Sequence, residues 1–424
     1  MEFAPVGTLG AAPLAANPGV ATSKSRASRF STAASRVLLF LLVLFIGIVV
    51  RVYCSSGFRG VGFDEHAYTV FLTEIEKSGA LNYDLVMRVC LERQQRTADA
   101  IVPATRVGFL LPAYAVAEVF QVSPFVALRY LNCGAAILTL LITLAFSYRA
   151  LGMGAMLGIG CLMATSPLAI HLSQRALVDG YFSLWATTAV WLAWENLRCP
   201  RHLGWLAAYF ASLVLLVLTK ESAAFVVVGL CAVLLWYGLQ GCCPWRLWVA
   251  TMAGPVVAIA VLATLTGGIT KLVQFYYVFE SKSGHNIYSV MAQDGPWYRY
   301  LIDFILLSPL ITTFALGAIF HLRRSVDTAL AIFLGASFVV MSAVSHGMSL
   351  RYAAYWELPL CWLAFLQVEL LAEKVRRNWR PFAIAGMVVL LSATNLWQYQ
   401  RLFVAGEIYD PISFQLARAT HLIK

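Results

Sequence analysis

Charged side chains are scarce in this chain of 424 residues. Asp, Glu, Lys and Arg make up 12% of the sequence and hydrophobic residues 60%, whereas a soluble domain carries about 25% charged residues. Several apolar runs, among them VLLFLLVLFIGIVV and ALAIFLGASFVVMSAV, approach the roughly 20 residues that a membrane-spanning helix needs. The composition therefore excludes a soluble domain and predicts an all-α integral membrane protein.

The chain also lacks the cysteine patterns of a disulfide scaffold or a zinc site. Its nine cysteines include no CxxC pair and lie mostly inside apolar runs, which favours buried thiols that act as small hydrophobic side chains. Cys54 and Cys90 share the first long loop, where a disulfide is the less favoured alternative. His, Cys and acidic residues show no convincing metal-ligand spacing, although a site made by Glu65 and a loop histidine stays open.

The net charge of +10 does not indicate a nucleic-acid partner, because the basic residues are scattered between apolar runs. Residues 1–36 are rich in Ala and Ser and contain four basic residues and one acidic residue. We interpret this segment as a disordered cytoplasmic tail ahead of an uncleaved first helix. An organelle transit peptide is the alternative.

Apolar runs and the residues that interrupt them predict eleven membrane spans, near 37–53, 128–148, 152–171, 177–195, 203–219, 222–240, 247–266, 302–320, 327–345, 353–372 and 381–397. With the N-terminus inside, every inner connection contains arginine, as the positive-inside rule requires. Two outer loops are then long, 54–127 and 267–301, and residues 398–424 form a short outer tail. TRVGFLLPAYAVAEVF in the first loop is short and contains Pro112, which predicts a helix at the membrane interface.

Ionisable and polar residues gather on the predicted outer face of the membrane. They lie in the long loops or at span ends, namely Asp64, Glu65, His66, Arg175, Asp179, Lys220, His346, Arg351 and Tyr352. Ionisable groups near a membrane are costly and usually mark functional sites. Arg and Lys can hold a phosphate through charge-assisted hydrogen bonds, and a carboxylate can take the proton of an attacking hydroxyl. The set is typical of group transfer from a phosphorylated lipid.

Several of these residues also have a structural interpretation. Arg175 and Asp179 are four residues apart and would form an ion pair at the end of one helix. Lys220 and Arg351 would reach toward lipid headgroups from span ends. His66 would be an interfacial histidine. Proximity of these groups within one outward cavity would favour chemistry, and isolated positions would favour a scaffold.

Five sequence landmarks, in order, resemble those of the GT-C glycosyltransferases that use polyprenyl-phosphate sugars, in particular the protein O-mannosyltransferases and the lipid A aminoarabinose transferases. FDEHAY is similar to the acidic motif in their first outer loop. SPLAIHLSQRALVDGYFSLW is similar to their segment with an arginine and then an aspartate at the start of a span. LTKESAA, GPWYRYLIDFILLSP and RYAAYWELPL resemble later landmarks. The resemblance covers about residues 37–372.

That resemblance implies a GT-C-type bundle of about eleven transmembrane helices, with a catalytic domain at 37–397 that opens to the non-cytoplasmic side of an inner or ER-type membrane. It implies inverting transfer of a sugar from an undecaprenyl- or dolichyl-type monophosphate to a hydroxyl of a protein, lipid or glycan. Asp64 would be the general base, and Glu65 would orient the base or the acceptor.

The resemblance also implies that Arg175, Lys220 and Arg351 bind the donor phosphate. Because these cations neutralise a monophosphate, no obligatory metal or other cofactor is expected, and a divalent ion is left open. Supporting positions would be His66, Asp179, Arg106, Tyr352 and His346.

The chain departs from the family pattern after the acidic motif. The family often has a Lys- or His-Pro-Pro stretch there, and this chain has IVPATRVGF, with Pro103 present and Arg106 in place of the lysine. The soluble domains of the two related groups also have no counterpart here. We therefore expect a core enzyme, or one that uses a partner to capture its acceptor.

A secondary transporter or lipid flippase is the alternative from another class. Transporters bind near the middle of the bilayer, often on helices broken at Gly or Pro in two related halves. In this sequence the charges lie at span ends on one side and the halves show no repeat. The pattern favours the enzyme and identifies neither its sugar nor its acceptor.

Overall fold

The computed structural model describes residues 24–53, 56–97, 100, 102–283, 288, 293–344, 348–420 and 422. The chain divides into two units, residues 1–41 and 42–424, and the site lies within the second. Regular structure in these described ranges is entirely helical, which confirms the expected all-α class.

The α-helices of the described residues are of unequal length, and several short helical turns connect them. The α-helices are α1 (Lys24–Val52), α2 (Phe63–Ser78), α3 (Tyr83–Arg96), α4 (Val107–Phe120), α5 (Pro124–Leu151), α6 (Met153–Ala164), α7 (Pro167–Ser173), α8 (Val178–Arg198), α9 (Leu203–Thr219), α10 (Ala223–Leu239), α11 (Trp245–Leu265), α12 (Ile269–Ser283), α13 (Arg299–Leu307), α14 (Pro309–Ile319), α15 (Ser325–Ser342), α16 (Glu357–Ala372), α17 (Arg380–Tyr399) and α18 (Ser413–Ala419). The connecting turns include η1 (Ala80–Asn82), η3 (Leu350–Trp356), η4 (Arg377–Trp379) and the π-helical η5 (Gln400–Ala405).

Several helices are long and apolar enough to indicate a multi-pass membrane protein. In the described part of the chain there are five, Ser35–Val52, Pro124–Leu151, Trp245–Leu265, Ser325–Ser342 and Arg377–Ala405, and a sixth if α6 and α7 form one broken span. The other expected spans are helical too, but α9 and α10 have 17 residues each and α14 has 11. The expectation of eleven full spans is therefore supported only in part.

Two of the expected spans are broken at a Ser-Pro dipeptide. The run 152–171 divides into α6 and α7, which meet at a bend of 61°. Pro167 begins α7, and the Ser166 hydroxyl accepts a hydrogen bond from the amide of Ala169. Pro309 likewise begins α14 after α13 has ended, but the Ser308 side chain makes no capping hydrogen bond. Proline disfavours the helical conformation of the residue before it and suits the first helical position, so each dipeptide ends one helix and starts another.

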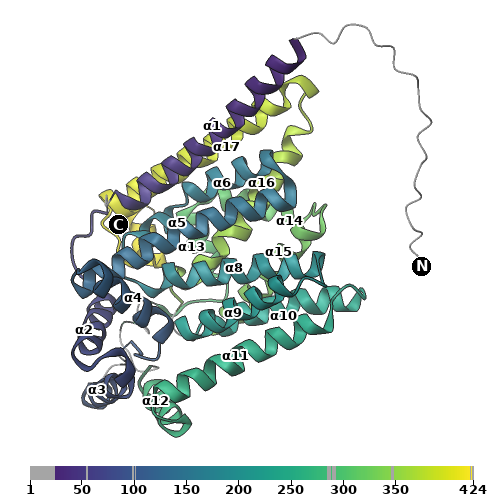
Figure 1. Ribbon diagram of the computed structural model, residues 1–424. Helices are drawn as coiled ribbons and strands as arrows, with labels where there is room; N and C mark the ends of the chain where they lie inside the picture. The colour runs from purple at the N-terminus through teal and green to yellow at the C-terminus, as the bar shows by residue number, and fades with distance from the viewer. Residues whose placement is uncertain are drawn as a thin grey trace. The chain divides into compact units, whose positions relative to one another are not determined.

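Helix α8 connects the parts of the bundle that carry the polar residues. It packs against η3. It also packs against α5 and α9, while α9 packs against α11, α10 against α15, and α14 against α16 (Figure 1). The expected first outer loop, residues 54–127, contains α2, α3 and α4, and α4 packs against α5 and α9. Helix α4 covers the expected short segment, and its 14 residues extend about 21 Å, too short to span a bilayer.

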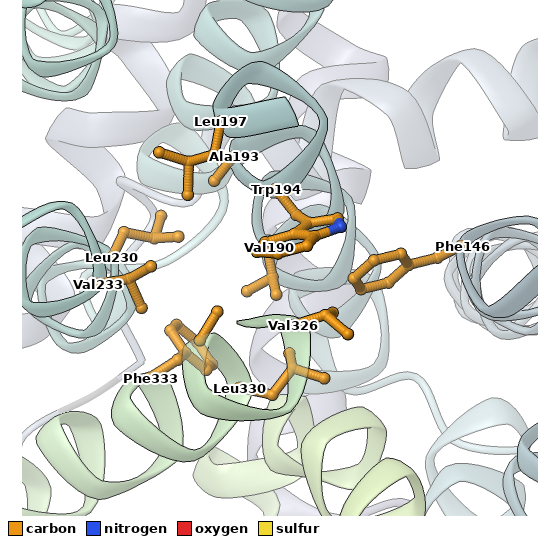
Figure 2. A pocket seen from close by; sticks show the side chains of 11 residues that line it. Phe146, Val190, Ala193, Trp194, Leu197, Leu230, Val233, Val326, Leu330 and Phe333 are labelled. Atoms are coloured by element: carbon orange, nitrogen blue, oxygen red, sulfur yellow. The ribbon is translucent and has the colours of Figure 1, made fainter. Parts of the chain in front are cut away.

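A small apolar cavity lies among α5, α8, α10 and α15 (Figure 2). Its volume is about 20 Å³, and it is lined by Phe146, Val190, Ala193, Trp194, Leu197, Leu230, Val233, Val326, Ala329, Leu330 and Phe333. Val190 is eleven residues beyond Asp179 on α8, or about 16 Å along the helix axis. The cavity is therefore separate from the polar residues at the start of α8.

Candidate functional site

Four of the expected residues form one network of ion pairs, here called the central cluster: Asp64, Asp179, Lys220 and Arg351. Arg351 Nη2 lies 2.5 Å from an oxygen of Asp64, and its Nε lies 3.8 Å from an oxygen of Asp179. Lys220 Nζ donates to the other oxygen of Asp179 at 2.5 Å. The structure thus brings together residues from α2, α8, the α9–α10 connection and η3.

Glu65 lies beside Asp64 but inside the protein. It is fully buried at the first turn of α2, where it accepts hydrogen bonds from the amides of Gly62 (2.9 Å) and Ala176 (2.7 Å) and from the guanidinium of Arg175. A glutamate at this position caps the helix N-terminus and interacts favourably with its dipole. These contacts fasten the start of α2 to the turn between α7 and α8.

Arg175 lies in that turn and holds the loop before α2. Besides Glu65, its guanidinium donates to the carbonyls of Phe58 (3.1 Å) and Gly60 (3.0 Å). The rings of Phe58 and Tyr409 lie 4.9 and 4.8 Å from its Cζ, a cation–π arrangement. The alternative in which Arg175 pairs with Asp179 along one helix is wrong, because Arg175 precedes α8 and the two residues bind different partners.

Arg106 forms a second charged group beside the central cluster. At the residue before α4, its buried guanidinium pairs with Glu221, whose carboxylate accepts at 3.2 Å from Nε, and donates to the hydroxyl of Tyr68. Burial and the charge of Glu221 act on Arg106 in opposite directions, and the net result raises the pKa of Arg106 well above its usual range. Because Glu221 follows Lys220, this pair fixes the α9–α10 connection against the segment between α3 and α4.

Tyr352 contacts both cations of the central cluster. Lys220 Nζ is 3.7 Å and Arg351 Cζ 5.1 Å from the centre of its ring. Burial lowers the pKa of Lys220, and the carboxylate of Asp179 opposes that shift. Burial also raises the pKa of Tyr352 to about 12. Lys220 and Arg351 are thus buried and paired, and the interpretation that they reach toward lipid headgroups is wrong.

Exposure distinguishes Asp64 from Glu65 and from the other three residues of the central cluster. Its side chain is 19% exposed, compared with 5% for Arg351, 3% for Asp179 and 2% for Lys220. Glu65 is completely buried. Asp64 is therefore the member of this set that another molecule can approach.

The remaining expected residues contribute less. His66 is exposed on the first turn of α2, and Cys90 is buried. His346 and Cys54 lie outside the described residues. Within the described ranges, no three His, Cys, Asp or Glu side chains meet in an arrangement that could hold a metal ion.

Sequence reasoning missed Asp410. This buried residue lies in the segment expected only as an outer tail, and its Oδ1 is 3.8 Å from Arg351 Nε. The tail contains EIYDP, an acidic and aromatic stretch after the last apolar run. Because ionisable residues near a membrane often mark functional sites, the acidic residues in this stretch were a signal for Asp410.

No family model matches the sequence, and no curated protein matches it. Among solved structures, ArnT from Cupriavidus metallidurans in the apo state has a TM-score of 0.54 and 16% identity, over 87% of this chain and 74% of that one. The chain has a GT-C fold. The same ArnT bound to undecaprenyl phosphate matches with a TM-score of 0.54, and both it and the oligosaccharyltransferase described next are GT-C membrane glycosyltransferases.

The archaeal oligosaccharyltransferase AglB from Archaeoglobus fulgidus, in complex with an inhibitory peptide and a dolichol-phosphate, is similar as well. Its TM-score is 0.55 at 11% identity, over 92% of this chain and 56% of that one. This chain thus spans little more than half the length of that enzyme. At these identities the likeness shows the fold, and the expected GT-C architecture is confirmed at that level.

Proposed function

We propose that the protein is a membrane glycosyltransferase that moves a sugar from a polyprenyl monophosphate to an acceptor hydroxyl on the non-cytoplasmic side of the membrane. The observation that carries the proposal is the partly exposed carboxylate of Asp64 in direct contact with buried Arg351. A base that an acceptor can reach and a cation for the departing phosphate are the two groups that this reaction needs.

In the proposed step, the acceptor oxygen attacks the anomeric carbon of the sugar and its proton passes to Asp64. The bond between the anomeric carbon and the phosphate oxygen breaks, and the electron pair leaves with the polyprenyl phosphate. Attack from the side opposite the leaving group inverts the configuration. Arg351 and Lys220 stabilise the charge that develops on the phosphate.

Arg351 is the phosphate ligand that the contacts favour most. Its Nε and Nη1 are buried without a hydrogen-bond acceptor among the described residues, and such donors are costly to leave unsatisfied. A donor phosphate would satisfy them and would compete with Asp64 for the guanidinium. Binding of the donor would thus release Asp64 to accept a hydrogen bond from the acceptor.

Arg175 was expected to bind the same phosphate, and its surroundings favour another role. Its guanidinium already donates to Glu65 and to two backbone carbonyls. We propose that Arg175 and Glu65 together hold the loop before α2, so that Asp64 keeps its position. Arg106 and Glu221 would hold Lys220 in the same manner from the other side.

The choice of donor is supported by the two similar enzymes. ArnT is known in complex with undecaprenyl phosphate and AglB with a dolichol-phosphate. Both ligands are polyprenyl-type monophosphates, the chemistry that Arg351 and Lys220 are suited to bind.

The experiment that tests the proposal follows radiolabelled sugar from polyprenyl-phosphate-linked donors into product, in membranes that contain the full chain. We expect wild-type protein to form labelled product and Asp64→Asn to lose at least 100-fold in rate, the lower range for a general base. Asp84→Asn is the matched control. Asp84 is a solvent-accessible aspartate in the same predicted loop, and it forms an ion pair with Arg88. Wild-type turnover by Asp64→Asn would exclude Asp64 as the base.

Transport of a lipid-linked substrate is the second candidate, and one observation favours it. Helices α6 and α7 form a pair bent by 61°, and broken helices often build the binding sites of transporters. Movement of a labelled polyprenyl phosphate across proteoliposome membranes, without chemical change, would support transport over transfer.

A further inference from the structure

The segment between η5 and α18, residues 406–412, is a folded part of the protein. The amide of Ile408 donates to the carbonyl of Leu402 at 3.2 Å, and the amide of Ile412 donates to that of Asp410 at 2.8 Å. Ile408 and Ile412 are 4% exposed and Asp410 is 2% exposed. The segment is therefore fixed against the bundle.

Two consecutive residues of this segment contact the two site arginines. The ring of Tyr409 lies on Arg175, 4.8 Å from its Cζ, and a carboxylate oxygen of Asp410 lies 3.8 Å from Arg351 Nε. The carbonyl of Tyr409 is in addition 2.9 Å from His171 Nε2. One short segment thus contacts both Arg175, which holds the loop before α2, and Arg351, the proposed phosphate ligand.

Asp410 is itself held firmly at both of its carboxylate oxygens. Ser349 Oγ donates to Oδ1 at 2.5 Å, Tyr288 donates its hydroxyl proton to Oδ2 at 2.9 Å, and Gln293 Nε2 lies 3.4 Å from Oδ2. Ser349 is also two residues before Arg351 in the chain. A carboxylate held in this way is a fixed negative charge beside a guanidinium.

We infer that Asp410 is a positioning residue for Arg351. Asp410 keeps the guanidinium of Arg351 in the site while Asp64 changes partners. The inference rests on the proposed function. Arg351 faces Asp64, Asp179 and Asp410, and Asp179 is shared with Lys220. When Asp64 takes the acceptor proton it ceases to balance the charge of Arg351, and Asp410 continues to do so.

The test compares Asp410→Asn with Glu407→Gln in the full chain, in detergent or membranes. Glu407 is an exposed carboxylate in the same segment, so its variant controls for a changed charge near the site. We expect Asp410→Asn to raise the KM for the polyprenyl-phosphate donor at least tenfold and to lower kcat more than threefold, with the acceptor KM unchanged. Glu407→Gln should match wild type. A donor KM for Asp410→Asn equal to that of Glu407→Gln would overturn the inference.

Two further measurements test the inference if Asp410→Asn does not fold or if no sugar transfer is observed. Ser349→Ala retains the carboxylate but removes its 2.5 Å hydrogen bond, and should raise the donor KM about two- to fivefold even if Asp410→Asn does not fold. An unchanged donor KM in Ser349→Ala would then count against the inference. Binding of undecaprenyl phosphate alone, followed by intrinsic tryptophan fluorescence, needs no turnover. If wild type binds this lipid but transfers no sugar, the proposed function fails, and a Kd at least tenfold higher for Asp410→Asn would still support the role of Asp410.

Discussion

At the scale of residues, Asp64 and Glu65 show how two adjacent carboxylates acquire different roles. Both open α2, but Asp64 points to a partly exposed position against Arg351, and Glu65 lies buried among donors from Gly62, Arg175 and Ala176. The sequence predicted the pair as a site. Their division of roles depends on the turn before α8 that receives Glu65, and residues more than 100 positions away supply that turn.

This difference predicts that Glu65→Gln destabilises the protein. The change leaves the buried guanidinium of Arg175 without its carboxylate, and breaking a buried ion pair costs about 3–5 kcal/mol. We expect a lower midpoint of thermal unfolding in detergent for Glu65→Gln. Asp84→Asn, at an exposed ion pair, should unfold within about 1 kcal/mol of wild type. An unchanged midpoint for Glu65→Gln would contradict the anchoring role of Glu65.

At the scale of elements, apolar runs located the helices well and their breaks poorly. Each of the eleven expected spans falls on helical structure, because hydrophobic length is a local property of the sequence. The runs 152–171 and 302–320 each proved to be two helices, and Ser166-Pro167 and Ser308-Pro309 mark the breaks. A Ser-Pro pair inside an apolar run was a readable signal, since proline favours the first position of a helix.

The close contact between α4 and α9 predicts that a larger residue at Gly108 destabilises the protein. A Cβ at Gly108 would lie 2.8 Å from the carbonyl carbon of Leu218 and from the amide nitrogen of Thr219, which directly precede Lys220. Gly108→Ala should therefore separate the two helices and displace Lys220, with a loss of about 1–3 kcal/mol in stability and weaker donor binding.

The matched control for that change is Gly134→Ala in α5. A Cβ at Gly134 meets nothing within 4 Å, and alanine is favoured over glycine in a helix by about 1 kcal/mol. Thermal unfolding of both variants, with binding of undecaprenyl phosphate as a second readout, distinguishes the two positions. Equal stability of the Gly108 and Gly134 variants would show that α4 and α9 can separate without consequence.

At the scale of the whole molecule, the two ends of α8 have different chemistry. Asp179 at its start belongs to the central cluster, and Glu195, 16 residues later and about 24 Å away along the axis, pairs with Arg149 at 2.7 Å. The scattered arginines predicted which end faces the cytoplasm. They did not predict Asp410, because a residue after the last span reaches the site only through the folding of the C-terminal segment.

The different chemistry of the two ends of α8 predicts the orientation of the protein in its membrane. Cys199 follows α8, is exposed and lies between Arg198 and Arg201, so it should face the cytoplasm under the positive-inside rule. Glu407 lies in the segment that carries Asp410 and should face the opposite side. In a background otherwise without cysteine, a membrane-impermeant maleimide should label Glu407→Cys in intact cells, and should label Cys199 only after the membrane is permeabilised. Labelling of Cys199 in intact cells would place the central cluster on the cytoplasmic side, where the acceptors and donors of the proposed reaction would have to be sought instead.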